Sequence, residues 1–224
     1  MHTISKSRFM AGRQCPRRLW QEIHHPERAD AYGAGTEFTF FQGHEVGALA
    51  RAWRGDGVLI EIEPGKIDQA VARTREVIRR GARRIYEAAF EYQGFLALAD
   101  VIEKRRDGSW RLIEVKATTA AKEIHVPDLA FQAWLMTRNG LLVSETAVVH
   151  LDSNVRWPES PLTLSGNTRE VLPRVPEVAR QAKQLARLIN TRTEPQVAPG
   201  RQCQDPYPCN FQNHCWRGVP EDHL

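Results

Sequence analysis

Three apolar segments between residues 84 and 118 constrain the fold of this chain more than any other part of the sequence. They read "RIYEAAFEYQ", "GFLALADVIEK" and "SWRLIEVKAT", and only Gly94 and the turn "RRDG" interrupt them. Short runs rich in β-branched and aromatic residues, bounded by turn residues, are typical of strands. Connections this short join neighbouring antiparallel strands, so the sequence predicts a meander of at least three strands.

Helices are predicted on both sides of the meander. Pro16 suits the first position of a helix, which places Cys15 at the N-cap. Further helices are expected over residues 36–54, 66–82, 127–140 and 175–190, with strands over 57–63 and 141–152, a Pro-rich connection before the last helix and a loop-rich tail after it. This order predicts an α/β fold in which helices pack on a sheet.

Length and composition restrict the class of protein. The 224 residues are enough for one domain with a substantial core, so the expected domain spans residues 1–224. No apolar run approaches the roughly 20 residues of a membrane span, and the N-terminus lacks the apolar core of a secretion signal, so we expect a cytoplasmic protein without a membrane partner. Of 31 basic residues, 25 are Arg, which suits a phosphate-bearing partner. An Arg-rich proteome explains the same bias, and composition alone favours that explanation.

Charged residues within the apolar strands are the first candidates for a site. Glu114 and Lys116 are two positions apart in a strand, so their side chains project from the same face. Asp100 lies in the preceding strand, among apolar neighbours. A lone carboxylate there is costly unless it is paired or binds a metal.

The turn between the two strands decides what Asp100 faces. A three-residue loop that ends at a left-handed Gly108 places Asp100 opposite Glu114. A two-residue turn that ends at Gly108 places it opposite Val115, and the two carboxylates then point to opposite faces. The sequence leaves both registers open.

In the first register, two carboxylates and an amine converge. Asp100, Glu114 and the carbonyl of Val115 would offer hard oxygen ligands to Mg²⁺ or Mn²⁺. Lys116 beside them would help to deprotonate or orient an attacking water. The alternative is a surface ion pair between Lys116 and Glu114, with Asp100 paired to an arginine.

The four cysteines lie at the two ends of the chain. Cys15 is near the start, and Cys203, Cys209 and Cys215 crowd into thirteen residues near the end. In an intracellular protein this pattern predicts a metal site rather than disulfides. Four thiolates can hold a tetrahedral Zn²⁺ or a [4Fe–4S] cluster. Four unrelated reduced thiols are the alternative.

Taken together, these motifs resemble the RecB-like branch of the PD-(D/E)XK nuclease superfamily. "ADV" and "EVK" in consecutive strands are similar to the acid–acid–lysine motif of that superfamily, and Gln132 in the next helix matches the first residue of the branch's Gln-x-x-x-Tyr motif. Met136 replaces the Tyr. His44 in "QGHEVG" is similar to the histidine that the branch carries in an upstream helix.

The cysteine pattern extends the resemblance over nearly the whole chain. One N-terminal and three C-terminal cysteines resemble the arrangement in iron–sulfur RecB-like nucleases, among them the CRISPR-associated exonucleases and the nuclease part of the AddB helicase subunit. The resemblance implies a restriction-endonuclease-like core over about residues 36–151, a mixed sheet flanked by helices. It also implies that a [4Fe–4S] cluster joins segments 8–25 and 195–218 through Cys15, Cys203, Cys209 and Cys215. The first gap in the tail, five residues between Cys203 and Cys209, is wider than in some of these families.

The implied function is divalent-metal-dependent hydrolysis of DNA, as an exonuclease on single-stranded or end-containing substrates, within a larger DNA-repair or CRISPR-type assembly. Asp100, Glu114 and the Val115 carbonyl would hold the ion with His44, and Lys116 would assist the water. Gln132 would orient the site or contact the DNA backbone, and Glu87 is a further candidate for the acidic pocket. The alternatives are a non-catalytic DNA-binding module and a zinc-stabilised structural protein.

Overall fold

The computed structural model describes residues 2–31, 34–156, 159–217 and 219, and it contains one mixed sheet of seven strands. Six strands follow the order β2-β3-β4-β5-β6-β7, and β1 pairs with β4 outside this path. The strands are β1 (Ile4–Ser5), β2 (Val58–Leu59), β3 (Arg84–Tyr92), β4 (Phe95–Lys104), β5 (Trp110–Val115), β6 (Val143–Leu151) and β7 (Leu162–Gly166). The predicted α/β class is confirmed.

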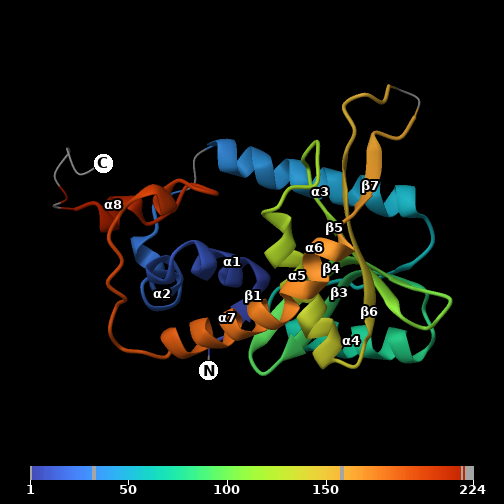
Figure 1. The fold of residues 1–224 in the computed structure, drawn as a ribbon, viewed down its shortest axis with the longest axis horizontal. Coiled ribbons are helices and arrows are strands. Elements are labelled where there is room, and N and C mark those ends of the chain that lie inside the picture. Colours follow the sequence, from blue (N-terminus) through green and yellow to red (C-terminus); the bar gives the residue numbers. More distant parts are fainter. Residues whose placement is uncertain (1, 32–33, 157–158, 218, 220–224) are drawn as a thin grey trace.

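Helices surround this sheet, and the helices near the N-terminus lie on the same side of the molecule as those near the C-terminus (Figure 1). The α-helices are α1 (Lys6–Gln14), α2 (Pro16–His24), α3 (Ala34–Arg54), α4 (Ile67–Arg79), α5 (His125–Arg138), α6 (Thr168–Val171), α7 (Val175–Leu188) and α8 (Gln212–Cys215). Short 3₁₀ turns are η1 (Pro26–Arg28), η2 (Leu172–Arg174) and η3 (Arg201–Cys203). Cys15 is the N-cap of α2 and Pro16 its first residue, as predicted.

The predicted meander is present as β3, β4 and β5, which pair antiparallel in sequence order. The sheet becomes mixed where β6 pairs parallel with β5, because the intervening α5 carries the chain back to the starting edge of the strands. The short strands β1 and β2 are also parallel to their neighbours β4 and β3.

The structure differs from the sequence prediction in four regions of the chain. The connection before the last long helix contains β7 and α6 rather than irregular chain, since β7 extends the sheet beyond β6. The residues before Cys15 form β1 and α1, which no periodic pattern indicated. Helix α5 begins at His125, so Pro127 lies within its first turn instead of opening it, a position where proline costs no hydrogen bond. The strand expected over residues 57–63 shortens to β2.

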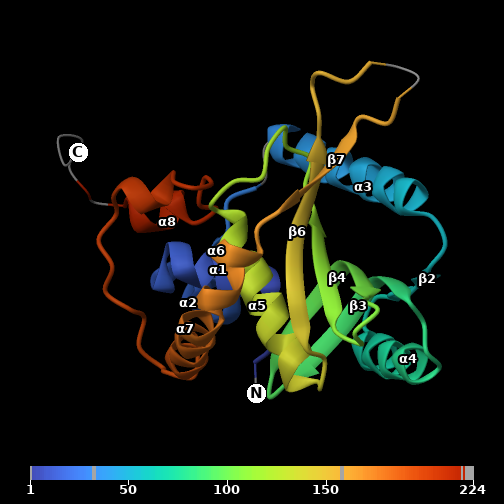
Figure 2. The ribbon, with the colours of Figure 1, turned by 45° about the vertical axis from the view of Figure 1, so that its right-hand side comes forward.

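Alternate residues of the central strands pack into separate cores on the two faces of the sheet. In β5, Leu112 belongs to the larger core, to which α1, α4, α5 and α7 contribute, whereas Ile113 belongs to a smaller core beneath α3. Figure 2 shows α3 set apart from α5 and α7 around the strands. Because side chains alternate between faces along a strand, Glu114 shares the α5 side with Leu112.

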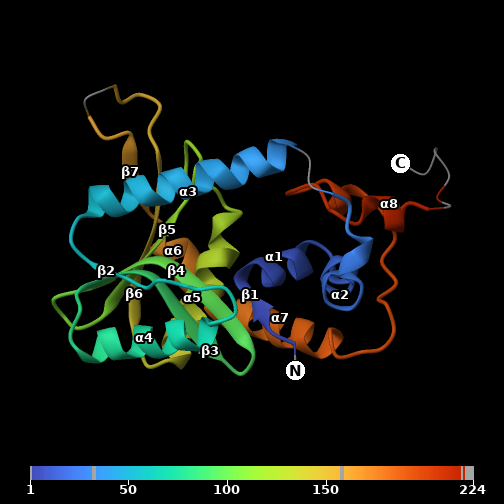
Figure 3. The same ribbon diagram turned by 180° about the vertical axis from the view of Figure 1, so that it is seen from behind.

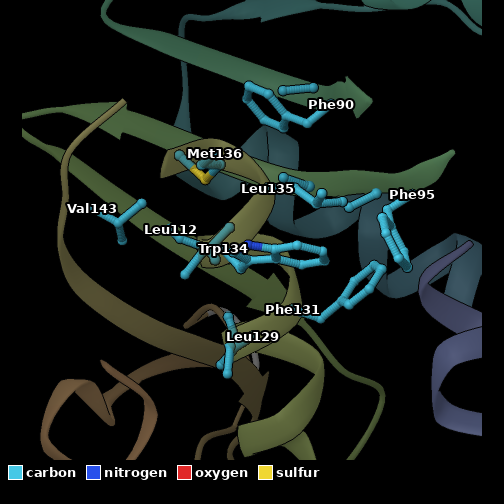
Figure 4. Close-up of a cluster of buried hydrophobic side chains, with 14 of the residues drawn as sticks. Phe90, Phe95, Leu112, Leu129, Phe131, Trp134, Leu135, Met136 and Val143 are labelled. Atoms are coloured by element: carbon cyan, nitrogen blue, oxygen red, sulfur yellow. The ribbon is translucent and has the colours of Figure 1, made fainter. Parts of the chain in front are cut away.

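Aromatic and aliphatic side chains mix in the larger core, where Phe131 and Trp134 of α5 lie near Phe95 (Figure 4). Phe131 of α5 stacks on Phe9 of α1, with ring centroids 4.6 Å apart, and meets Phe95 of β4 edge-on at 6.3 Å. Trp134 lies edge-on to Phe95 at 4.9 Å. These contacts join the N-terminal helix to the sheet through α5.

The C-terminal tail returns to the N-terminal helices, and Figures 1 and 3 show α8 beside α2. Gln14 donates hydrogen bonds of 2.7 Å to the carbonyl oxygens of both Gln202 and Tyr207. The two ends of the chain are therefore linked by direct contacts. Among the described residues, no helix has the length and apolar character that crossing a membrane requires.

Phe131→Ala should lower the free energy of unfolding by about 3–5 kcal/mol, because it opens a cavity where three elements meet. Urea denaturation followed by circular dichroism measures this loss. Leu142→Ala is the control, since Leu142 is 69% exposed and its truncation should change stability by less than about 0.5 kcal/mol. Equal losses in the two variants would contradict the central place of Phe131.

Candidate functional site

The β4–β5 turn adopts the register that brings the two acids together. The amide of Arg105 donates to the carbonyl of Ser109 at 2.7 Å, which leaves a three-residue loop, and its last residue, Gly108, is left-handed with φ +86°. The ladder pairs Val101 with Ile113, so the next pair along it is Asp100 and Glu114. The amide of Val115 donates to Asp100 Oδ2 at 2.7 Å.

A hollow of about 370 Å³ collects most of the predicted site residues. Helix α3 contributes one side, and the ends of β3, β4 and β5 contribute the other. Its lining includes His44, Arg51, Glu87, Asp100, Glu114, Val115 and Lys116, with Gly43 and Gly47 on the helix. The five residues predicted to hold or assist a metal ion (His44, Asp100, Glu114, Val115 and Lys116) therefore share one cavity.

Glu87 enters this hollow through an unusual backbone conformation. Its φ is +54°, in the left-handed region, although it lies within β3 and is not a glycine. Its neighbours Tyr86 and Ala88 pair with Val101 and Ala99, so Glu87 stands beside Asp100 on the adjacent strand. Such a conformation costs of order 1–3 kcal/mol and is typical of functional sites. The strained backbone therefore supports Glu87 as a further acid of the site.

Glu114 is the most heavily bonded residue of the site. Its side chain is 1% exposed. Lys116 donates to Oε1 at 2.6 Å, and Gln132 of α5 donates to Oε2 at 2.5 Å. Lys6 donates to both oxygens, at 2.9 Å and 3.1 Å. Gln132 therefore contacts Glu114 directly, although it does not line the hollow.

Sequence reasoning missed two members of this network. Asp128 accepts hydrogen bonds of 3.0 Å from both Lys116 and Gln132, and Lys6 lies 3.6 Å from its Oδ1. Asp128 and Gln132 are four residues apart in α5, so helical periodicity could have placed them on one face. Lys6 had no comparable signal, because only the tertiary fold brings β1 and α1 to the sheet.

The lysines set the electrostatics of the buried acids. Burial opposes ionisation of Glu114, but Lys6 and Lys116 hold its pKa well below the usual range. Burial also disfavours the charged lysines, yet Asp128 and Glu114 raise the pKa of Lys6, and Glu114 and Asp128 raise that of Lys116. Both lysines are therefore ammonium ions at neutral pH.

Asp100 is the acid that these lysines do not neutralise. Burial, followed by the charge of Glu114, raises the pKa of Asp100 to about 7, although Lys6 and the Val115 amide act in the opposite direction. Two ammonium ions face three carboxylates, those of Asp100, Glu114 and Asp128. A proton or another cation bound at Asp100 would balance the charges of these five groups.

The chemistry of the donors suits a divalent ion. Carboxylate and carbonyl oxygens with one imidazole are ligands that Mg²⁺ and Mn²⁺ accept. Their present placement does not form a ready ligand set, since within residues 2–31, 34–156, 159–217 and 219 no three Asp, Glu, His or Cys side chains group as metal ligands. Glu114 is turned to Lys6, Lys116 and Gln132 instead.

The cysteines lie at a second site, between the two ends of the chain. Cys15, Cys203, Cys209 and Cys215 all line one small cavity of about 10 Å³, together with Arg17 and Arg18. Among the described residues, no carboxylate lines this cavity. Burial raises the pKa of the Cys215 thiol to about 11. The four cysteines thus share a location, as predicted, but they too fall outside any ready ligand group in the part of the chain that the structure describes.

Comparisons with known proteins give little further information. No family model and no curated protein matches the chain. Among solved structures, the crystal structure of SSO0001 is similar, with 16% sequence identity, 98% of this chain and 88% of that chain covered, and a TM-score of 0.44. A likeness of this strength identifies neither a family nor an activity.

Asp100→Asn should stabilise the protein at pH 8 when divalent ions are absent. The folded-state pKa of about 7 exceeds the unfolded value of roughly 3.9, so the native carboxylate loses stability as the pH rises from 4 through 7. The amide keeps an acceptor for the Val115 amide and carries no charge. Because Asp100 is only half-buried, we expect a gain of about 2 kcal/mol at pH 8 and none at pH 3, below both pKa values.

Urea denaturation at the two pH values measures this difference. Asp68→Asn, at an exposed position in the first turn of α4, is the matched control and should show no pH-dependent gain. A variant that is less stable than the wild type at both pH values would show that Asp100 is a structural acceptor rather than a strained acid.

Proposed function

We propose that this protein is a divalent-metal-dependent DNA nuclease of the RecB-like branch of the PD-(D/E)XK superfamily. The observation that carries the proposal is the register of the β4–β5 hairpin, which sets Asp100 opposite Glu114. Lys116 lies 2.6 Å from Glu114, and Gln132 contacts the same carboxylate from α5. The motif positions in the sequence name these same residues, and their convergence in the fold supports the proposal.

The roles follow from the placement of each group. Asp100, Glu114, the Val115 carbonyl and His44 would hold the ion within the hollow. When bound, a divalent ion supplies a Lewis acid that offsets charge on the phosphodiester in the transition state. Lys116, as an ammonium ion at the edge of the hollow, would orient the attacking water and offset charge on the scissile phosphate. Gln132 and Asp128 hold Glu114 and Lys116 in their relative positions.

DNA is the proposed substrate because the hollow combines acids with an accessible guanidinium. Arg51 of α3 lies 3.5 Å from Glu87, and both line the hollow. Arginine binds phosphate well, so a backbone phosphate entering this hollow would meet Arg51 and Lys116. Action on single strands or ends, and a place in a larger repair or CRISPR-type assembly, follow from the family resemblance.

Lys116→Met and Asp100→Asn should each reduce cleavage by at least roughly 100-fold, because one removes an ammonium ion at the reacting centre and the other removes a metal ligand. The assay uses end-labelled single- and double-stranded DNA with Mn²⁺ or Mg²⁺. Lys104→Met and Asp68→Asn are matched controls at exposed positions, and both should cleave like the wild type.

The outcomes separate the candidate functions. Unchanged cleavage in both site variants would overturn the assignment of the site. Wild-type protein that binds DNA but cleaves none would favour a non-catalytic DNA-binding module.

We further propose that the four cysteines hold a [4Fe–4S] cluster that joins the two ends of the chain. The support is their common cavity and the two arginines in its lining, Arg17 and Arg18, which would balance the negative charge of a thiolate-bound cluster. Because burial raises the pKa of the Cys209 and Cys215 thiols, metal binding there would release protons, and it would be coupled to folding.

Purified protein should show a broad visible absorption and about four iron atoms per chain. Cys209→Ser should lose most of the iron and much of the soluble yield. Tyr207→Ala is the control in the same tail, since Tyr207 is 55% exposed and lies outside the cavity lining. A colourless protein with one zinc ion per chain would instead establish the zinc-stabilised alternative.

A further inference from the structure

Lys6 reaches the candidate active site from a part of the chain that carries none of the recognised motifs. It is the first residue of α1, directly after β1, which pairs with the start of β4. The side chain of Lys6 is 22% exposed, and its ammonium lies 2.9 Å and 3.1 Å from the two oxygens of Glu114. It therefore occupies the chelating position between these oxygens.

The hydrogen bonds of Glu114 leave little room for another ligand. A carboxylate offers about four lone-pair positions. Lys6 uses one on each oxygen, Lys116 uses a second on Oε1, and Gln132 uses a second on Oε2. A divalent ion can bind Glu114 only if one of these donors leaves.

Lys6 is the donor with an alternative partner close by. Its ammonium already lies 3.6 Å from Oδ1 of Asp128, so a small shift completes that ion pair. Lys116 already bonds Asp128 through Oδ2, and Gln132 is fixed within the fully buried part of α5. Repulsion between an ammonium and a divalent ion on the same carboxylate gives this exchange its direction.

We propose that Lys6 is a resident cation of the metal site, which neutralises Glu114 until a divalent ion binds and then transfers to Asp128. Lys6 is thus a positioning residue that lowers the metal affinity of the site and keeps its acids paired without the ion. The inference rests on the proposed metal-dependent function, because it concerns the same Glu114.

The test measures Mn²⁺ binding directly, by isothermal titration calorimetry on cluster-loaded protein freed of divalent ions. Lys6→Met keeps the aliphatic stem and removes the charge, so its Kd for Mn²⁺ should fall at least roughly tenfold. Lys6→Gln should give a change of the same sign, and Lys6→Arg should stay close to the wild type. Lys122→Met, at an exposed lysine before α5, is the control and should not change the Kd.

A second measurement uses only the wild type and Lys6→Arg, so it does not depend on the folding of a variant that lacks the positive charge. The chain has only six lysines, so ¹⁵N-lysine labelling gives few ammonium signals, and Lys6→Arg identifies the signal of Lys6. Mg²⁺ should shift this signal in the wild type. A signal that stays in place at saturating Mg²⁺ would overturn the exchange.

The remaining outcomes distinguish this inference from the proposed function. If the wild-type protein binds neither Mn²⁺ nor Mg²⁺, both the nuclease proposal and the role of Lys6 are overturned. Wild-type protein that binds Mn²⁺, together with a folded Lys6→Met that binds it no more tightly, would overturn the role of Lys6 alone and leave the nuclease proposal in place.

Discussion

A buried carboxylate, that of Glu114, organises the middle of this molecule. An ionised carboxylate out of contact with water is strongly unfavourable unless charged or hydrogen-bonding partners surround it. The partners of Glu114 come from three separate segments: Lys6 from the N-terminus, Lys116 from the end of β5, and Gln132 from α5. The sheet, the crossover helix and the first helix must therefore assemble together before this charge is satisfied.

The same arrangement explains why the acids of the site differ in character. Glu114 faces two ammonium ions and remains ionised, whereas Asp100 receives one backbone amide and a share of repulsion from Glu114. Two carboxylates on facing strands thus acquire opposite tendencies from their surroundings alone. Glu87, on β3, adopts a strained left-handed conformation and lies 3.5 Å from Arg51.

Local patterns in the sequence predicted the elements whose signals are local. The meander, the helix that begins at Pro16 and the α/β class are confirmed, and one of the two weighed turn registers is present because Gly108 adopts the left-handed conformation. The gathering of Asp100, Glu114 and Lys116 followed from that register. Strands β1 and β7 are too short to show a period, and their place depends on pairing with β4 and β6.

The site residues that sequence reasoning missed, Lys6 and Asp128, are likewise brought to the site by tertiary contacts rather than by a local pattern. Lys6 lies 108 positions before Glu114, so no spacing rule connects the two residues. Asp128 lies in the first turn of α5, where the helix dipole favours any acid, so its position alone indicates no site. The activity, the metal ions and the cysteine-held cluster stay predictions that rest on these placements.

Helix α1 connects the two candidate sites as a single rigid element. Its nine residues run from Lys6, which touches Glu114, to Gln14, and its C-cap is Cys15 at the cysteine cavity. At about 1.5 Å per residue the helix is roughly 13 Å long. A hydrogen-bonded helix transmits displacement along its axis with little compression. The length of this one helix therefore sets the separation of the cysteine cavity from the acid pocket, and a displacement of Cys15 along the helix axis would be passed to the backbone of Lys6.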